Sequence, residues 1–291
     1  MPKAIPTYTI EQLNHCDSGI SMNVDIRLLQ DHVRNVDGIH FPHRHDFYNL
    51  IFITQGKGTH DIDFRKYEVR PYQLFFMNDG QIHEWDLSPD IQGFTLFFKK
   101  EFYNVAEPIF SLPHLPFFNN SGNEAPLVVF DESEAKIIGH FFEDIYNEFQ
   151  KNLSFNEAII KTLLKIILIR ALRIYEPNYT DSGSNLNIAK VRAFESLIEQ
   201  NYTKFKGVKD YANLLSITPN YLNAICSKTV GKSAGEMIRT RVILEAKRLL
   251  IHSSLSICEM GYKLGYDDCS YFIRIFKKEE GKTPEQFRLN S

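Results

Sequence analysis

The sequence predicts a multidomain α+β protein: an N-terminal antiparallel β jelly roll with amphipathic helices, followed by an all-α domain with two helix-turn-helix units. Three observations lead to this prediction. Short strand-like runs fill the chain to about residue 103, helical periodicity begins near Asp131, and one motif of the C-terminal part occurs twice. A chain of 291 residues is long enough for two modest domains, each with its own core.

The N-terminal region consists of short strand-like runs separated by turn residues. The run YNLIFITQGKGTHDIDF holds a Gly56-Lys57-Gly58 turn and then a strand with His60, Ile62 and Phe64 on one face. Two more such runs are QLFFMNDGQIHEWDL and IQGFTLFFKKEF. No long helical pattern interrupts them, so residues 1–130 are expected to form one antiparallel barrel or sandwich of the jelly-roll kind.

Two helices are predicted for residues 131–176. The first, ESEAKIIGHFFEDIYNEFQK, is amphipathic, and the second opens on a capping-box spacing from Ser154 to Glu157. The second helix is apolar on more than one face. It either lies between the barrel and its neighbouring helix or forms a subunit interface, and the two are compatible, so we expect a dimerisation segment and a possible homodimer. Residues 177–187 are polar and turn-rich and are predicted to be a linker.

The C-terminal region, residues 188–291, contains two matched helix-turn-helix units, at 207–231 and 256–281. A shift of 50 residues places Tyr221-Leu222 on Tyr271-Phe272, and Gly231-Lys232-Ser233 on Gly281-Lys282-Thr283. Thr218 and Asp268 are the expected caps of the second helix in each unit. A continuous helix of some 16 residues, roughly 24 Å, joins the units. This length suits two helices placed about one DNA turn apart, roughly 34 Å.

The charge distribution also favours DNA binding by the C-terminal part. Residues 188–291 contain 17 Lys+Arg and 11 Asp+Glu, a balance of +6, whereas the remainder has 16 and 25, a balance of −9. A basic module attached to an acidic domain is typical of a DNA-binding protein with a second function.

The sequence also predicts the compartment. It has no apolar run of about 18 residues, and its first residues, MPKAIPTYTIEQLNHC, lack the apolar core of a signal peptide. We therefore expect a cytoplasmic protein without a membrane partner. The four cysteines, Cys16, Cys226, Cys258 and Cys269, show no CxxC spacing and are expected to be buried or half-buried thiols.

Residues 188–291 resemble the DNA-binding domain of AraC/XylS-type transcription regulators. The segment SICEMGYKLGYDDCSYFIRIFKKEEGKTPEQFR is similar to the second helix-turn-helix signature of that family along its full length. The resemblance implies seven helices, two recognition helices in adjacent major grooves, promoter DNA as partner, and RNA polymerase as a further partner if the protein activates. The chain departs from the family at Gly261, where alanine is usual, and at Ala224 and Cys226, where larger or basic residues are common.

Four polar residues on the outer faces of the second helices are candidates for reading bases. Arg274 suits guanine, with a phosphate contact or an intradomain ion pair as its alternative role. The asparagines suit adenine or are simply solvated. The base-reading candidates are Asn220, Asn223, Ser270 and Arg274. The expected phosphate contacts are Lys228, Lys232, Lys277, Lys278 and Lys282.

Three histidines of the N-terminal region have a spacing that resembles a cupin. Cupins bind a metal with two histidines, a glutamate and a later histidine, but Asn49 stands where the glutamate is expected. We therefore predict no metal and no cofactor. The residues predicted to form a pocket for a small-molecule effector are His43, His45, Tyr48 and His83. Aromatic side chains that either line this pocket or form core are Phe41, Phe47, Tyr48, Phe52, Phe76 and Trp85.

Together these patterns predict a sequence-specific DNA-binding transcription regulator that is controlled by a small molecule in the barrel, and not an enzyme. Two alternatives remain at this point. One is a metal-dependent cupin enzyme with a helical appendage, which Asn49 and the basic C-terminal part disfavour. The other is a constitutive DNA-binding regulator whose barrel binds nothing.

Overall fold

The computed structural model describes residues 5–13, 23–35, 41–103, 105, 110, 112, 115–118, 125–151, 153–175 and 186–289. It divides into two compact units: Pro6–Phe118 with Glu124–Tyr179, and Thr180–Ser291 with two short segments, Met1–Ile5 and Asn119–Asn123. The predicted linker lies outside the described residues except for its last two positions. Among the helices that the structure describes, none is both long enough and apolar enough to cross a bilayer.

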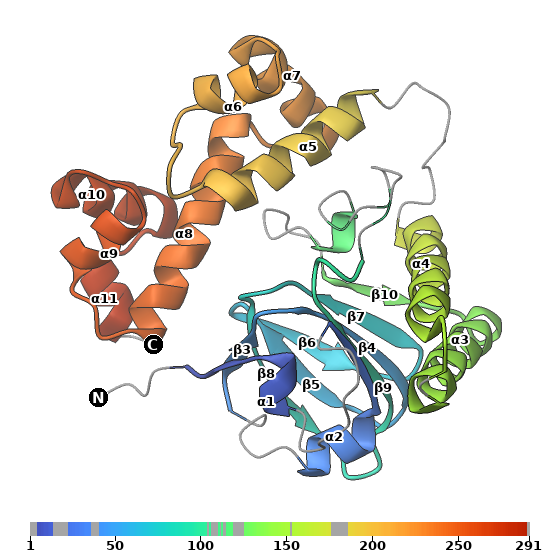
Figure 1. The fold of residues 1–291 in the computed structure, drawn as a ribbon. Helices are drawn as coiled ribbons and strands as arrows, with labels where there is room; N and C mark the ends of the chain where they lie inside the picture. Colours follow the sequence, from blue (N-terminus) through green and yellow to red (C-terminus); the bar gives the residue numbers. More distant parts are fainter. Residues whose placement is uncertain are drawn as a thin grey trace. The chain divides into compact units, whose positions relative to one another are not determined.

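Two five-stranded sheets form the N-terminal unit (Figure 1). The first sheet has the order β1 (Thr7–Tyr8), β3 (His43–His45), β8 (Ile82–Leu87), β5 (Gly58–Ile62) and β6 (Arg65–Val69). The second has the order β10 (Leu127–Val129), β7 (Gln73–Met77), β4 (Tyr48–Gln55), β9 (Gln92–Phe98) and β2 (Val24–Leu28). Every pairing is antiparallel except that of β1 with β3.

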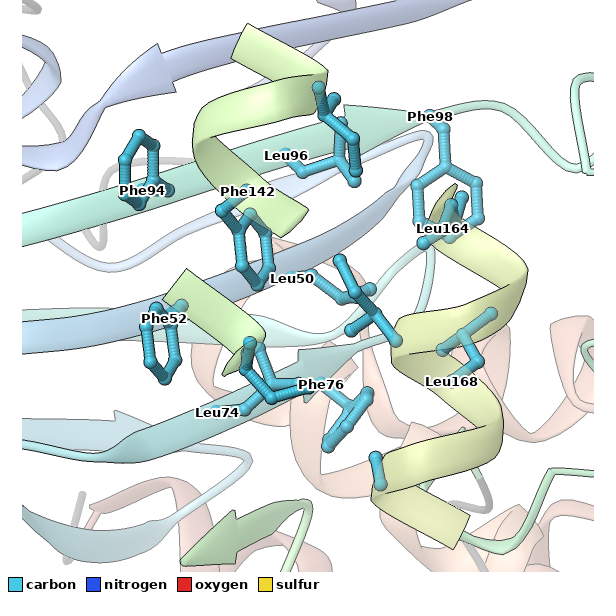
Figure 2. Close-up of a cluster of buried hydrophobic side chains, with 14 of the residues drawn as sticks. Leu50, Phe52, Leu74, Phe76, Phe94, Leu96, Phe98, Phe142, Leu164 and Leu168 are labelled. Atoms are coloured by element: carbon cyan, nitrogen blue, oxygen red, sulfur yellow. The ribbon is translucent and has the colours of Figure 1, made fainter. Parts of the chain in front are cut away.

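The two faces of the second sheet belong to different cores, because successive side chains of a strand point to opposite faces. Phe47, Ile51 and Ile53 of the β4 region face the inside of the barrel, where they pack with residues of both sheets. Leu50 and Phe52 face the other way, toward α3 (Glu132–Lys151) and α4 (Asn156–Tyr175). Figure 2 shows this second core, in which Phe142 of α3 lies beside Phe52 and Phe94.

The helices α3 and α4 cover the outer face of the second sheet (Figure 1). The fully buried ring of Phe142 stacks on Phe52 at 5.4 Å between ring centroids and on Phe94 at 5.7 Å. Leu164 and Leu168 of α4 enter the same core (Figure 2). The reading of α4 as a helix packed between the barrel and its neighbour is therefore confirmed.

Several local predictions for the N-terminal unit were wrong. Helix α4 begins at Asn156, whose side-chain oxygen accepts the amide of Glu157, so Ser154 does not form the expected capping box with Glu157. Phe64 is exposed with φ of +70°, because the strand ends at Ile62 and the chain turns there. Strand β6 and the short helices α1 (Ile10–Leu13), α2 (Leu29–Asn35) and η3 (Pro116–Phe118) have no counterpart in the sequence reading.

The C-terminal unit is helical throughout its described residues, 186–289, with the seven helices that the resemblance implies. They are α5 (Leu186–Asn201), α6 (Val208–Leu214), α7 (Pro219–Val230), α8 (Ala234–His252), α9 (Ile257–Lys263), α10 (Cys269–Glu280) and α11 (Pro284–Leu289). Helix α8 joins two small cores: one with α5, α6 and α7, the other with α9, α10 and α11 (Figure 1). Its 19 residues span roughly 28 Å.

The predicted capping residues begin the helices of both units. Thr218 accepts the amide of Tyr221, with Pro219 at the first helical position, and Asp268 accepts the amide of Ser270. Capping boxes are also present: Ser233 with Glu236, Ser256 with Glu259, and Thr283 with Gln286. Each cap satisfies amides that have no partner inside the helix, so the start of each recognition helix is fixed locally.

Two glycines allow α9 to pack closely. Gly265 has φ of +81°, and a Cβ there would lie 1.7 Å from the carbonyl oxygen of Thr203, so no other residue fits. A Cβ on Gly261 would lie 3.2 Å from the Phe272 ring of α10. In the first unit, Ala212 corresponds to Gly261 and Leu222 corresponds to Phe272. The second unit therefore pairs a smaller residue on its first helix with a larger residue on its second helix. Gly261 therefore makes room for Phe272.

The expectation of thiols was wrong for two of the four cysteines. Cys258, near the start of α9, and Cys269, at the start of α10, form a disulfide across the second helix-turn-helix unit. Cys226 is a free and buried thiol, and burial raises its pKa to about 12. Cys16 lies outside the described residues. The CxxC rule missed the pair because the cysteines are 11 residues apart, on two helices that are joined by a turn.

Candidate DNA-reading surface and barrel site

Helices α7 and α10 expose most of the predicted base-reading residues. Asn220 lies at the second position of α7, and Ser270 and Arg274 lie one above the other on α10; all three side chains are exposed. The apolar residues of the same helices, Leu222 in α7 and Phe272 in α10, are fully buried. Each helix is therefore held by one face and presents polar groups on the other.

Asn223 is placed differently from the other three. Its side-chain oxygen accepts the amide of Ala234 at 3.0 Å, and its side chain is half-buried between α7 and the start of α8. Reading adenine with two hydrogen bonds requires both the oxygen and the nitrogen of an asparagine amide. In this conformation the oxygen of Asn223 is already engaged by Ala234, whereas Asn220 lies on the exposed start of the helix.

The acidic residues at the end of α10 turn toward α8. Glu279 accepts a hydrogen bond from Arg239 at 2.7 Å, and Glu280 lies 3.2 Å from the ammonium group of Lys247. Their charges are therefore compensated within the domain. The outer face of α10 carries the cations Arg274, Lys277 and Lys278, and the carboxylates of Glu279 and Glu280 point away from this face toward α8.

The predicted phosphate-binding lysines lie at or near the ends of the recognition helices. Lys232 is half-buried in the turn after α7. The exposed members are Lys228, Lys277, Lys278 and Lys282. Exposed lysines give salt-dependent affinity for a polyanion and do not select a sequence.

Two exposed tyrosines were missed among the candidates. Tyr221 on α7 and Tyr271 on α10 occupy equivalent positions of the repeat, with exposed fractions of 38% and 50%. The Tyr221 hydroxyl donates to Asn187 at 2.7 Å, and the Arg274 guanidinium lies 5.8 Å from the centroid of the Tyr271 ring. The alignment of the repeat contains the signal, since it pairs the two tyrosines on an otherwise polar face.

Helix α8, the strut between the two helix-turn-helix units, is fixed to α5 by a buried arginine. Arg241 is only 5% exposed and donates from Nε to both carboxylate oxygens of Glu199, at 2.9 and 2.7 Å. It also contacts Glu245 at 3.1 Å, and its guanidinium lies 4.0 Å from the centroid of the Tyr202 ring. The contact lies between the two small cores, so it helps to set their relative placement.

In the barrel, the three predicted histidines come together. His43 and His45 lie on β3 and His83 on the neighbouring β8, with His43 directly opposite His83 in the register. One ring nitrogen of each residue lies within 4.8 Å of those of the other two, and all three side chains are buried. A fourth histidine, His60 on β5, contacts this group: its Nε2 is 2.9 Å from Nδ1 of His83.

Four buried histidines of the barrel, His32, His45, His60 and His83, are neutral at physiological pH. Burial lowers the pKa of His60 to about 3 and that of His32 to about 3. Burial, with the neighbouring histidines as a further cause, also lowers the pKa values of His45 and His83 well below 6.5. A neutral imidazole has one nitrogen with a lone pair, so each ring can act as a hydrogen-bond acceptor or as a metal ligand.

Tyr48 does not join the histidines. Its ring stacks on Phe98 at 5.6 Å and packs against Phe118, on the helix side of the second sheet. Phe52 and Phe76 lie on that side too, and Phe41 is 70% exposed. Of the aromatic side chains expected around the pocket, those that lie inside the barrel are Phe47 and Trp85. The error arose because β4 alternates between two cores that are both apolar.

Several buried polar atoms inside the barrel have no hydrogen-bond partner among the described residues. Nδ2 of Asn49 is one of them, although its Oδ1 accepts the hydroxyl of Thr95 at 3.0 Å. Further examples are Nδ1 of His32, Nε2 of His45, Nε2 of His83 and Nε1 of Trp85. Buried polar groups are nearly always satisfied, so such a group calls for a bound water, ion or ligand.

Comparison with known proteins gives matches to both parts of the chain. A family model described as an AraC-like ligand binding domain matches residues 32–165, and one described as a helix-turn-helix domain matches residues 211–290. The arabinose operon regulatory protein of Escherichia coli (strain K12) is 24% identical over 245 residues, which cover 83% of this chain and 80% of that protein.

Two further similar proteins span most of both chains. The HTH-type transcriptional activator RhaR of Yersinia pestis bv. Antiqua (strain Angola) is 19% identical over 247 residues, covering 84% of this chain and 83% of that protein. Among solved structures, ToxT from Vibrio cholerae strain SCE256 with bound unsaturated fatty acid is 14% identical, with a TM-score of 0.41. That match covers 93% of this chain and 96% of ToxT.

Proposed function

Because the chain belongs to the AraC-type transcription regulators, we propose that α7 and α10 read a two-part DNA site and that a small effector inside the barrel controls this binding. The observation that carries the DNA part is the repeat itself. Two capped helices of the same length expose polar residues from opposite ends of one strut. The length of α8 separates α7 from α10 and suits two major grooves on one side of a duplex, about one helical turn apart.

Within this proposal, sequence is read by Asn220, Ser270 and Arg274, with a lesser part for Asn223, whose oxygen also binds the amide of Ala234. Arg274 has the leading role because arginine can donate two hydrogen bonds to guanine. The affinity that does not depend on sequence comes from Lys228, Lys232, Lys277, Lys278 and Lys282. Tyr221 and Tyr271 add contacts with the sugar-phosphate backbone through their hydroxyl groups.

The effector part of the proposal rests on the polar interior of the barrel. Asn49, His45 and His83 each present a buried atom without a hydrogen-bond partner, inside a core that is otherwise apolar. A few convergent polar groups with apolar surroundings are typical of a small-ligand site. His43 completes the group, and Tyr48 is left out because it faces the helix side of the sheet.

The remaining partners follow from the same proposal. In this proposal the protein is a regulator and does not catalyse a reaction. It works in the cytoplasm, where it reaches the chromosome. As an activator it would also contact RNA polymerase. We further propose a homodimer through α3 and α4. The region around the start of α4 supports this, because it exposes the apolar side chains of Leu153, Phe155 and Ile159.

Replacing Arg274 with alanine tests the DNA part of the proposal. We expect discrimination at one base position to fall by about 1–3 kcal/mol, or about 5- to 150-fold, because the two hydrogen bonds to guanine are lost. The measurement is the affinity for the selected site and for its three single-base variants at that position.

The matched control is Lys277→Ala, on the same helix. It should weaken binding to all four sequences alike and reduce the dependence of affinity on salt by about one counterion. If Arg274→Ala behaves in the same way as this control, Arg274 contacts a phosphate and does not read a base.

A further inference from the structure

We propose that the barrel holds one transition-metal ion on the imidazoles of His43, His45 and His83, from the group of ions that prefer nitrogen ligands, with Zn²⁺ as the reference. This inference rests on the proposed effector site in the barrel and names the chemistry of its ligand. It reverses the expectation of no metal, which was drawn from the replacement of a glutamate by Asn49.

The positions of the three rings already approach those of a metal site. The ring centroids are 4.2 Å apart for His43 and His83, 4.8 Å for His45 and His83, and 4.9 Å for His43 and His45. Their ligand nitrogens lie within 4.8 Å of one another. Tetrahedral zinc with nitrogen ligands at about 2.0–2.1 Å requires nitrogens roughly 3.4 Å apart. Binding of the ion would require the rings to rotate so that this difference is closed.

The protonation of the rings favours a metal over a hydrogen-bond donor. Nδ1 of His43 lies 2.8 Å from the carbonyl oxygen of Phe41, which can only accept, so Nδ1 carries the proton and Nε2 has the lone pair. Nε2 of His45 and Nε2 of His83 are buried and have no hydrogen-bond partner among the described residues. Three buried imidazoles whose ligand nitrogens lie within 4.8 Å of one another suit a cation.

His60 acts as the positioning residue for His83. Its Nε2 is 2.9 Å from Nδ1 of His83, and the tautomer in which Nδ1 of His83 donates leaves Nε2 of His83 available to the metal. His43 has the same arrangement with a backbone carbonyl as partner. Histidines that bind metals usually donate their second nitrogen in this way, which fixes both the tautomer and the ring orientation.

The ligand set also defines the class of ion. The cluster contains three imidazoles and no carboxylate. The oxygen of Asn49 is held by Thr95, so it does not replace the missing glutamate. Magnesium, calcium and manganese prefer oxygen ligands, whereas zinc, copper, nickel and cobalt bind imidazole well. The site is therefore expected to select the second group, with the fourth position of a tetrahedral ion open.

The test uses the full chain without a polyhistidine tag, treated with a chelator and then dialysed. Co²⁺ is titrated while its visible absorption is recorded, since a four-coordinate nitrogen site gives characteristic bands, and Zn²⁺ is then added as competitor. The fluorescence of Trp85 is a second reporter. Trp85 is the single tryptophan of the chain, and its ring centroid lies 5.5 Å from that of His83. Bound Co²⁺ should therefore quench it.

The variants compared with the native chain are His45→Gln, His83→Gln and His60→Gln, with His140→Gln as matched control, because His140 is exposed on α3. We expect one Co²⁺ per chain for the native protein and the control, and none for His45→Gln or His83→Gln. Affinity should fall about 10- to 100-fold for His60→Gln. Circular dichroism and DNA binding show whether each variant is folded.

Each result distinguishes the metal from the effector role. Absence of stoichiometric binding to the native chain overturns the inference, as does equal binding by folded His45→Gln. In either case a shift of the melting temperature by an organic ligand would still support the proposed function. Stoichiometric metal that leaves DNA affinity unchanged confirms the metal site but contradicts its role as the effector site.

Discussion

Replacing Arg241 with alanine is expected to lower the free energy of unfolding of the C-terminal unit by about 3–5 kcal/mol. The guanidinium is almost fully buried and pairs with Glu199 and Glu245 while it stacks on Tyr202. Its removal leaves the carboxylate of Glu245, which is only 16% exposed, with Arg248 as its remaining partner. A buried charge that loses a partner costs more than the ion pair contributes, so the effect should be large.

The control lies two residues earlier on the same helix. Arg239 pairs with Glu279 of α10, but its side chain is 36% exposed, and loss of such a pair should cost less than about 1 kcal/mol. Chemical denaturation of Arg241→Ala and Arg239→Ala gives both values. Equal and small effects would mean that solvent reaches the Arg241 site and that the strut is not fixed there.

The disulfide between Cys258 and Cys269 is expected to contribute about 3 kcal/mol to the same free energy of unfolding. The bond closes a loop of roughly a dozen residues, and the chain-entropy model gives this value for a loop of that length. The measurement is denaturation of the native chain with and without a phosphine reductant. Because Cys258 is exposed and Cys269 is half-buried, the reductant can reach the bond.

The double variant Cys258→Ser, Cys269→Ser serves as the control for this experiment. It should have the stability of the reduced native chain, and the reductant should not change it further. A native chain whose stability does not respond to the reductant would show that the two cysteines remain thiols in solution, as the sequence alone suggested.

The DNA-binding half could be predicted from the sequence because its signals are local. Thr218, Asp268 and Ser233 cap helices within a few residues of themselves, and the repeat supplied each motif twice. What escaped prediction depends on contacts between elements. The bond from Asn223 to Ala234 and the packing of Gly261 against Phe272 require the folded domain, and no single helical pattern contains them.

In the barrel the sequence identified the histidines but not their surroundings. His43, His45 and His83 were grouped correctly because their spacing resembles that of a cupin. Tyr48 was grouped with them wrongly, since both faces of β4 are apolar and alternation alone does not say which face is inside. His60 was missed as a partner because it comes from β5, a neighbour of β8 only in the sheet.

Selection of bound sequences from a random DNA pool by the full chain tests the central claim most directly. The account predicts two conserved elements whose centres lie about 10–10.5 base pairs apart, because α7 and α10 reach adjacent major grooves from one strut. Arg274→Ala should blur one position in one element and leave the other element unchanged. A single conserved element, or no enriched sequence at all, would contradict the account of a two-part reader.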